Sequence, residues 1–324
     1  MNDYLWDRSG SPDPEVERLE RVLGMLRHRN GAVAAPVVSA TRRRWLPVAA
    51  AAAVIGAAIA LQWPWAGTPE STPWIVTAIE APADASLNQG SALRTGQSIR
   101  TGRATNVTLE AEGFGRIELK PDSELQVLAS RQGRQSLSLP RGTIHALIWA
   151  PPRRFVVNTP SAKAIDLGCE YTLTVDQRGD GLVRVQTGWV AFQHEDRESF
   201  IPAGAACATT KRHGPGTPYF EDASEAFRRS LSGFDQTAGR DDLDTVLQEA
   251  RRRDAVTVWH LLRRVPASER GAVFDRFAEL VEVPAGVTRE AIVAGDESML
   301  DECWNALGLE SAEWWREWKR DWRQ

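Results

Sequence analysis

Hydrophobic and polar positions follow three successive patterns along the 324 residues. Residues 45–65 carry no charged side chain. From 73 to 213 apolar residues alternate with polar ones in short runs separated by Gly, Pro and Asp, which predicts strands. From 221 to 324 apolar residues recur every three or four positions, which predicts helices. We therefore expect a multi-domain chain: an arm at 1–44, an apolar segment, an all-β domain, a linker at 214–220 and an all-α domain.

The apolar segment Trp45–Trp65 has the length of a transmembrane helix, because 21 helical residues extend about 30 Å. Arg42, Arg43 and Arg44 precede it, and tryptophans stand at both ends, where interfacial aromatic side chains belong. The many alanines would also suit a buried helix of a soluble protein. A cleaved signal peptide is a third interpretation, but Pro64 and Trp65 occupy the place of a cleavage site. We predict a single membrane-spanning helix.

The distribution of charge predicts the orientation of this helix. Arginines flank its N-terminal side, whereas the first charged residues beyond it are Glu70, Glu80 and Asp84. Because basic flanks stay in the cytoplasm, we expect residues 1–44 there and residues 66–324 on the exported side. The formal net charge of the whole chain is −4, which argues against nucleic acid as a partner.

The arm contains one short amphipathic helix, from Pro12 to about His28. Its opposite face carries Glu15, Glu17 and Glu20, which an anionic lipid surface would repel. One short helix cannot bury its own apolar stripe, so we expect a partner protein to cover it. The predicted partner-binding stripe consists of Val16, Leu19, Leu23 and Leu26.

The all-β domain is predicted at 73–213 from alternating runs at even spacing. We expect strands at 75–81, 107–111, 117–119, 125–129, 137–139, 144–148, 155–157, 171–175, 183–185 and 190–192. Turn signals such as Pro121-Asp122 and Arg141-Gly142 separate them, and no helical pattern intervenes. Such strands must pair with one another, in a sandwich, a jelly roll or a solenoid-like fold.

Six ordered pieces of this domain resemble successive strands of the FecR domain. They are Gly96–Thr101, Gly115–Leu125, Gly142–Ile144, Phe155–Pro160, Leu167–Tyr171 and Val183–Val190. The resemblance spans roughly residues 95–195 and is closest at Phe155–Pro160. It implies a single-pass protein of the bacterial inner membrane, with a cytoplasmic N-terminus and a periplasmic C-terminus, that takes part in signal transduction. In this family the periplasmic part senses a state outside, and the cytoplasmic arm restrains or assists an extracytoplasmic-function sigma factor, as an anti-sigma factor does.

Three cysteines are present, Cys169, Cys207 and Cys303. Cys169 stands where the FecR family more often has Thr. In an oxidising periplasm Cys169 and Cys207 could form a disulfide, with Cys303 as a small core residue. The alternative is three unpaired buried thiols, and the sequence leaves both open.

The all-α domain, 221–324, is predicted to consist of short antiparallel helices. They are expected at 224–234, 242–253, 255–264, 269–281, 289–293, 299–307 and 312–323, with Ser268, Thr288 and Ser311 as N-caps and Gly308 as a stop. The last helix carries a C-terminal aromatic stripe: Trp314, Trp315, Trp318 and Trp322. We expect it to dock on Leu300, Trp304 and Leu307; a partner protein or the membrane surface are the alternatives.

No motif of a hydrolase, metalloprotease, phosphate-binding loop or dinucleotide site occurs, so we expect neither catalysis nor a cofactor or metal. His194-Glu195-Asp196 is expected to be a solvated turn, and Arg240-Asp241-Asp242 a helix start. The sequence thus favours a membrane-anchored FecR-like regulator that binds a sigma factor through residues 1–44. The alternative is a membrane-tethered binding or scaffolding protein whose β and helical domains bind a periplasmic or envelope partner.

Overall fold

The computed structural model describes residues 72–80, 88–131 and 133–309. All of them belong to one compact unit, Trp65–Gln324. Sixteen strands come first in the described chain, and helices follow. The strands are β1 Trp74–Glu80, β2 Ala92–Leu93, β3 Ser98–Arg100, β4 Asn106–Ala111, β5 Gly115–Leu119, β6 Glu124–Arg131, β7 Arg134–Ile148, β8 Phe155–Asn158, β9 Lys163–Asp166, β10 Glu170–Val175, β11 Gly181–Thr187, β12 Trp189–His194, β13 Arg197–Pro202, β14 Ala205–Thr210, β15 Gly214–Pro215 and β16 Tyr219–Phe220.

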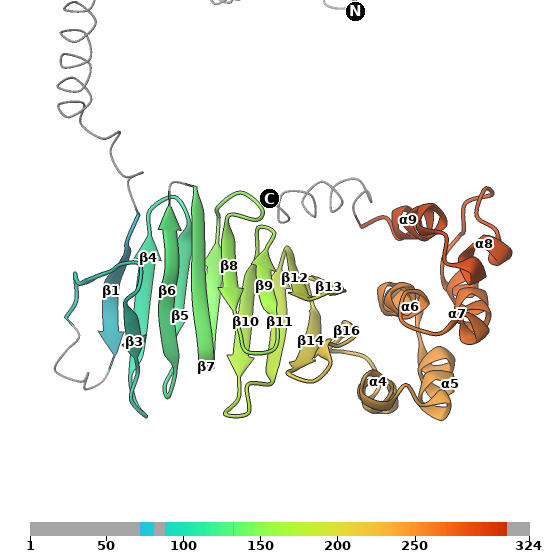
Figure 1. The fold of residues 1–324 in the computed structure, drawn as a ribbon, viewed down its shortest axis with the longest axis horizontal. Helices are drawn as coiled ribbons and strands as arrows, with labels where there is room; N and C mark the ends of the chain where they lie inside the picture. The colour runs from blue at the N-terminus through green and yellow to red at the C-terminus, as the bar shows by residue number, and fades with distance from the viewer. Residues whose placement is uncertain (1–71, 81–87, 132, 310–324) are drawn as a thin grey trace, which may run out of the picture. The chain divides into compact units, whose positions relative to one another are not determined.

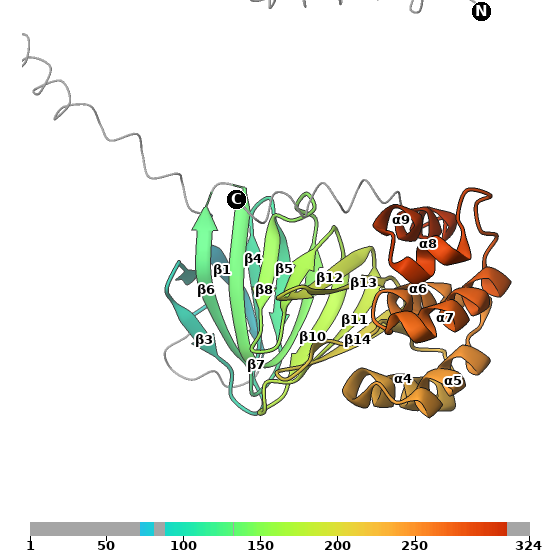
Figure 2. The ribbon, with the colours of Figure 1, turned by 45° about the vertical axis from the view of Figure 1, so that its right-hand side comes forward.

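The strands form two layers that share β7 (Figures 1 and 2). The first half of β7 pairs with β6 and β8, and its second half pairs with β5 and β10. The change occurs at Gly142, whose φ is 98° and whose added Cβ would lie 2.3 Å from the Cα of Ser123. Only glycine permits both that conformation and that close approach. The two runs predicted at 137–139 and 144–148 are therefore one bent strand.

Successive hairpins alternate between the layers. One layer holds β4–β5, β10–β11 and β14, and the other holds β6, β8–β9 and β12–β13. The pairing is antiparallel except between β7 and β8. This arrangement confirms the predicted all-β domain as a large antiparallel β structure.

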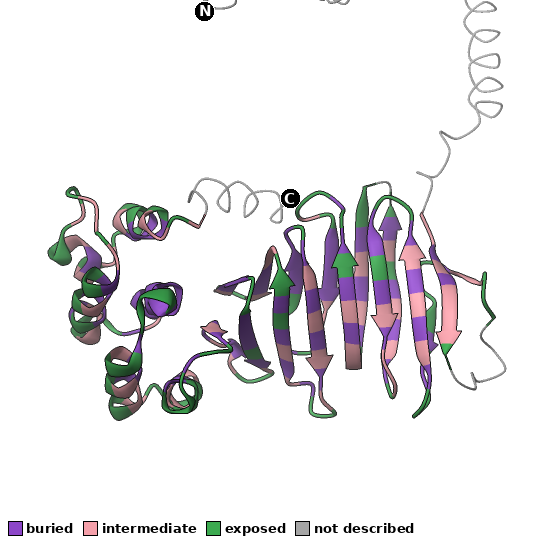
Figure 3. Cartoon of the chain, turned by 180° about the vertical axis from the view of Figure 1, so that it is seen from behind, coloured by how far each residue is buried: buried purple, intermediate pink, exposed green. Residues whose placement is uncertain are grey.

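The core lies between the layers because each strand turns alternate side chains inward. Strand β5 shows the pattern. Ile117 and Leu119 are fully buried, whereas Arg116, which precedes Ile117, is exposed. Bands of buried and exposed residues repeat along neighbouring strands (Figure 3). Trp74 closes one end, with its ring 5.8 Å from that of Phe155 and its Nε1 donating to Oε1 of Gln135 at 3.2 Å.

Residues 214–220, predicted to be a linker, belong to the sheet. Strands β15 and β16 both pair with β14, and the Gly216 N–H donates to the Ala208 carbonyl at 2.8 Å. Glycine and proline suggested an open connection, but here they form tight turns along a strand edge whose backbone groups need partners.

The helices are α4 Glu225–Thr237, α5 Arg240–Glu249, α6 Ala255–Leu262, α7 Ala267–Leu280, α8 Arg289–Ala294 and α9 Glu297–Ala306, with a 3₁₀ turn, η1, at Arg252–Asp254. The predicted N-cap Thr288 is confirmed, since its side chain accepts from the Ala291 N–H. Ser268 is not a cap, because α7 begins at Ala267, two residues earlier than expected, and Pro266 is its N-cap. Gly308 follows α9 at a φ of 67°, as expected of a stop.

Three predicted features fall outside the described residues: the arm 1–44, the membrane segment 45–65 and the last helix, 312–323. Among the residues that the structure does describe, no helix is long and apolar enough to span a membrane.

Candidate functional site

The helices are joined to the sheet by a cluster of aromatic rings, buried except for the partly buried Trp189, and here called the joint. Trp304 of α9 lies at its centre, with ring centroids 4.7 Å from Trp259 of α6, 5.5 Å from Phe200 of β13 and 5.9 Å from Trp189 of β12. The Trp259 indole N–H donates to the Leu300 carbonyl at 2.7 Å. The contacts are edge-on or tilted, the geometry that aromatic pairs favour.

His260 connects α6 to the edge strand β13. Its Nε2 accepts the Phe200 backbone N–H at 3.0 Å, and its Nδ1 lies 2.7 Å from the Val256 carbonyl, to which it donates. This pairing requires a neutral ring, because a proton on Nε2 would face the Phe200 N–H. Burial, and secondarily Arg264, lower the pKa of His260 to about 3. Helix α6 thus covers β13, a strand at the edge of the sheet whose backbone groups would otherwise be open.

A buried charge pair completes the joint. The Arg264 guanidinium faces Oδ1 of Asp235 at 3.4 Å and donates to Oγ of Ser199 at 2.7 Å. Asp235 also accepts from the Thr217 N–H at 2.5 Å and from Arg197 at 3.2 Å. Burial lowers the pKa of Arg264 to about 10. Because these charges satisfy one another, we assign the cluster a structural role.

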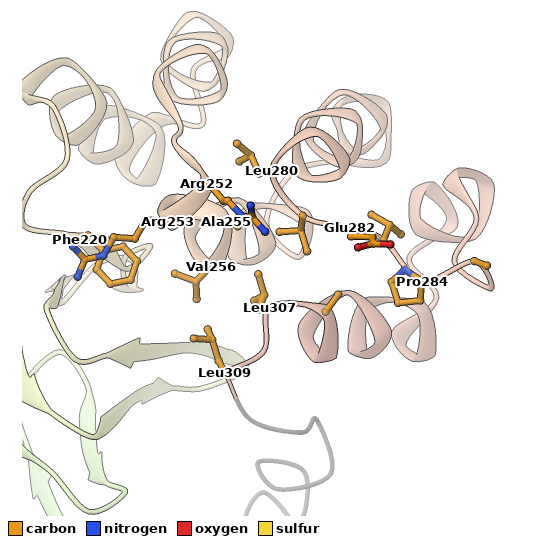
Figure 4. Close-up of a pocket in the computed structure, with 14 residues that line it drawn as sticks. Phe220, Arg252, Arg253, Ala255, Val256, Leu280, Glu282, Pro284, Leu307 and Leu309 are labelled. Carbon is orange, nitrogen blue, oxygen red and sulfur yellow. The ribbon is translucent and has the colours of Figure 1, made fainter.

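Beside the joint lies an open groove of about 870 Å³, a volume in the range of ligand sites (Figure 4). It is formed by the 3₁₀ turn, the start of α6, the end of α7 with the loop after it, and the chain beyond α9. Figure 4 shows Val256, Leu307 and Leu309 around the same space. Its apolar lining consists of Phe220, Ala255, Val256, Leu280, Val281, Val283, Pro284, Ala285, Ala306, Leu307 and Leu309.

The charged residues of the groove differ in their pairing. Arg253 lies over the Phe220 ring, with Cζ 4.2 Å from the centroid, and donates to Asp222 at 2.8 Å. Arg252 and Glu282 also line the groove, and neither makes an ion pair within the part of the chain that the structure describes. The groove is therefore an apolar surface with one cation and one anion available at its rim.

A second, polar cavity of about 760 Å³ lies between the turn after β8 and the turn after β12. Lys163, Gln193 and His194 are among its lining residues. Of His194-Glu195-Asp196, predicted to be a turn, Glu195 and Asp196 form it, with Glu195 at a φ of 49°, while His194 is the last residue of β12. Arg240-Asp241-Asp242 begins α5, also as predicted. In the described ranges no three His, Cys, Asp or Glu side chains are placed to hold a metal ion.

The Cys169–Cys207 disulfide is not formed, and all three cysteines are free and buried. Cys207 on β14 pairs with Val183 on β11, and Val183 pairs with Leu173 on β10, so Cys207 and Leu173 lie at the same level two strands apart. Cys169 lies four residues before Leu173 in the chain. At about 3.3 Å per residue and 4.8 Å per strand, the two Cα atoms are roughly 16 Å apart, far beyond the reach of a disulfide, about 7 Å. The alternation of apolar and polar residues along one strand does not show how that strand is aligned with its neighbours.

Cys169 instead belongs to a buried polar cluster between the layers. Its thiol donates to Oδ2 of Asp166, and the Gly168 N–H donates to Oδ1 at 2.8 Å. Burial raises the pKa of Asp166 to about 7, and burial together with Asp166 raises that of the Cys169 thiol well above its usual value. The Tyr171 hydroxyl is buried without a hydrogen-bond partner among the described residues.

The other predicted site residues have mixed outcomes. Val16, Leu19, Leu23 and Leu26, and likewise Trp314, Trp315, Trp318 and Trp322, lie outside the described residues. Leu300 and Trp304, expected to face the aromatic stripe, are instead buried in the core, at 5% and 0% exposure. Leu307 is partly buried and lines the groove. Sequence reasoning missed the groove because its residues come from four separate segments.

Comparison with known proteins identifies one region of the chain. Residues 97–191 match the family model described as FecR protein. The resemblance seen at roughly 95–195 is thereby confirmed, and the matched span runs from the start of β3 to β12. The groove and the joint's helices lie beyond it. No curated protein matches the chain.

Two solved structures resemble the chain. Both are crystal structures of a protein from Parabacteroides distasonis ATCC 8503 that is described as a "putative anti-sigma factor". Each is 14% identical to this chain with a TM-score of 0.34. The matches cover 39% and 44% of this chain and 60% and 65% of the other, so this chain spans less than two thirds of that protein's length.

Proposed function

We propose that the protein is a membrane-anchored FecR-like signal-transduction protein whose exported part controls an extracytoplasmic-function sigma factor. The observation that carries this proposal is the FecR match over residues 97–191. In this role residues 45–65 cross the inner membrane, the β layers and helices form the periplasmic sensor, and residues 1–44 bind the sigma factor. The role requires binding and no catalysis.

The joint supports a sensor that responds as one body. His260, Arg264 and Trp304 tie the helices to β13 through buried contacts. In the proposed role, an event at the helices reaches the matched β layers, which precede them in the chain, through these contacts. Elements that share packed side chains and hydrogen bonds can transmit a change in this way.

Topology is tested by fusing alkaline phosphatase after Gln324 of the full chain. We expect an active enzyme, because alkaline phosphatase matures outside the cytoplasm. The fusion belongs at the end of the chain, since Pro218, at the predicted linker, accepts a hydrogen bond from Thr257 within the folded unit. An inactive phosphatase, together with an active cytoplasmic reporter at the same position, contradicts the proposed orientation.

Sigma-factor binding is tested by capture on the full-length protein in detergent. Leu19→Asp and Leu23→Asp place a charge in the apolar stripe, where each buried Leu contributes about 1.5–3 kcal/mol. Arg21→Asp introduces the same side chain outside the stripe and serves as the matched control. We expect an extracytoplasmic-function sigma factor of the same organism to be captured by the wild type and the control only. Equal capture by all four proteins rejects the stripe as the binding surface.

The second candidate function is a membrane-tethered binding or scaffolding protein without transcriptional output. The groove of about 870 Å³ favours it, because an apolar groove with charged residues at its rim suits a protein segment. The two functions separate in the capture experiment: a scaffold retains envelope proteins and no sigma factor.

A further inference from the structure

We propose that the groove beside the joint is the docking site of the chain's own last fifteen residues, 310–324. The occupant is thus an intramolecular segment rather than a separate partner. This inference does not depend on the regulatory function proposed above.

The first argument is the point at which the described chain ends. Leu309 is partly buried and is itself part of the groove's lining, and Glu310 follows it directly. Trp314 is only five residues further, which is about 8 Å along a helix and about 17 Å along an extended chain. The tail therefore follows directly on a residue that lines the groove, and its first tryptophan is at most about 17 Å along the chain from that residue.

The second argument is the chemistry of the two surfaces. The stripe Trp314, Trp318 and Trp322 recurs at the four-residue spacing of one helix face. Each tryptophan has about 150–250 Å² to cover, and the floor of the groove offers Val256, Leu280 and Leu307. The core cannot accept the stripe at Trp304 and Leu300, because Trp259, Phe200 and Trp189 already surround Trp304.

The third argument is charge. Glu313, Glu317 and Asp321 each directly precede a tryptophan of the stripe, so on a helix they form an acidic row along one edge of it. Arg252 at the groove has no ion-pair partner in the described part of the chain, whereas Arg253 is held by Asp222. The acidic row can pair with Arg252, and the tail's basic residues, such as Lys319, can pair with Glu282, the available anion at the rim.

The test compares hydrogen exchange at the groove in the full chain with that in a chain ending at Leu309, both in detergent. We expect the backbone amides of residues 281–283 and 285 to exchange at least tenfold more slowly in the full chain. Trp318→Glu should remove that protection, and Arg320→Glu, the same change on the other helix face, should leave it. These two variants lie in the tail, so the groove itself stays unaltered.

A groove variant provides an independent check. Val283→Asp places a charge in the lining, while Val287→Asp makes the same change at another partly buried valine outside the groove. Only Val283→Asp should weaken binding of a synthetic peptide of residues 310–324 to the truncated chain, by tenfold or more. Equal exchange in the full and truncated chains overturns the proposal. Protection that disappears on dilution also overturns it, because it indicates that the tail of a second copy fills the groove. Protection that requires added lipid vesicles overturns it as well, because it indicates a membrane surface.

Discussion

The interior of the β layers and the joint both bury an ionisable group, but with opposite preferences for a proton. Asp166, between the layers, has a pKa raised to about 7 by burial, so its site favours the protonated acid. His260, at the joint, has a pKa lowered to about 3, so its site favours the neutral base. Desolvation disfavours charge in both places and therefore moves an acid and a base in opposite directions.

The two regions also differ in what holds them together. The strands are held to one another by backbone hydrogen bonds, whereas the helices are held to the sheet by side chains. Between the layers, backbone ladders hold the strands whatever the charge of Asp166. At the joint, side chains of α6 and the residues after it bond to the backbone of β13: the Phe200 N–H donates to the His260 ring, and the Glu198 carbonyl accepts from Arg264, whose buried pair with Asp235 lies beside it. The attachment of the helices is thus the more sensitive to substitution and to acid.

The largest effect is expected at the aromatic centre of the joint. Trp304→Ala should lower the free energy of unfolding by about 3–5 kcal/mol, because a fully buried Trp leaves a large cavity. Trp149→Ala is the matched control, since Trp149 is 55% exposed and should change stability by less than about 0.5 kcal/mol. Denaturant unfolding of the full chain in detergent measures both. Similar losses for the two variants contradict a packed joint.

Next in size is the charge pair. Asp235→Asn should cost about 3 kcal/mol, because it leaves the Arg264 guanidinium buried without its counter-charge. The double variant Asp235→Asn with Arg264→Met removes both charges and should be more stable than Asp235→Asn alone. If the double variant is the less stable protein, the two side chains do not act as a pair.

A smaller, pH-dependent effect is expected from His260. Its folded pKa, about 3, lies below the usual 6.5, so the folded protein binds fewer protons between these values. Stability is therefore complete above pH 6.5 and is lost as the pH falls toward 3, by at most about 1.4 kcal/mol per unit. His260→Gln should be less stable at pH 7.5 yet lose less stability than the wild type between pH 7 and 5. Parallel pH curves for the two proteins refute this role.

The smallest effect is expected from Asp166 and has the opposite sign. Its folded pKa is raised from 3.8 to about 7, so ionisation costs stability as the pH rises from about 4 and costs the full amount above about 7. Asp166→Asn should therefore stabilise the protein by about 1–2 kcal/mol at pH 8 and by little at pH 4. If Asp166→Asn is less stable than the wild type at pH 8, the ionised carboxylate of Asp166 stabilises the fold and this prediction is wrong.

The alternation of apolar and polar residues predicted those strands of the β domain that bury only one face. It located the hairpin of Val107–Ala111 and Ile117–Leu119, whose inward side chains are apolar. It missed β13, because residues 199–202 are buried on both faces and so do not alternate. It also divided β7 at Gly142, where local composition signals a turn but the chain only bends.

The candidate site could be predicted only in part. The helices that form the groove were expected, and Leu307, one of the residues expected to face the aromatic stripe, is partly buried and lines the groove. Leu300 and Trp304 were assigned to the same surface because helical spacing does not tell which neighbour covers a stripe. The joint arises from the register of β13 against α6, a long-range contact between Phe200 and His260 that no local pattern encodes.

The central claim, control of a sigma factor by an exported FecR-like sensor, is tested most directly by a transcriptional reporter in cells. The reporter is driven by the extracytoplasmic-function sigma factor that the full-length protein captures, in strains that carry the wild type, Trp304→Ala or Leu19→Asp at matched membrane levels. We expect sigma-dependent transcription to change at least severalfold in both variants, since one disrupts the sensor and the other the cytoplasmic stripe. Transcription equal in all three strains, and unchanged when the gene is deleted, would contradict the account.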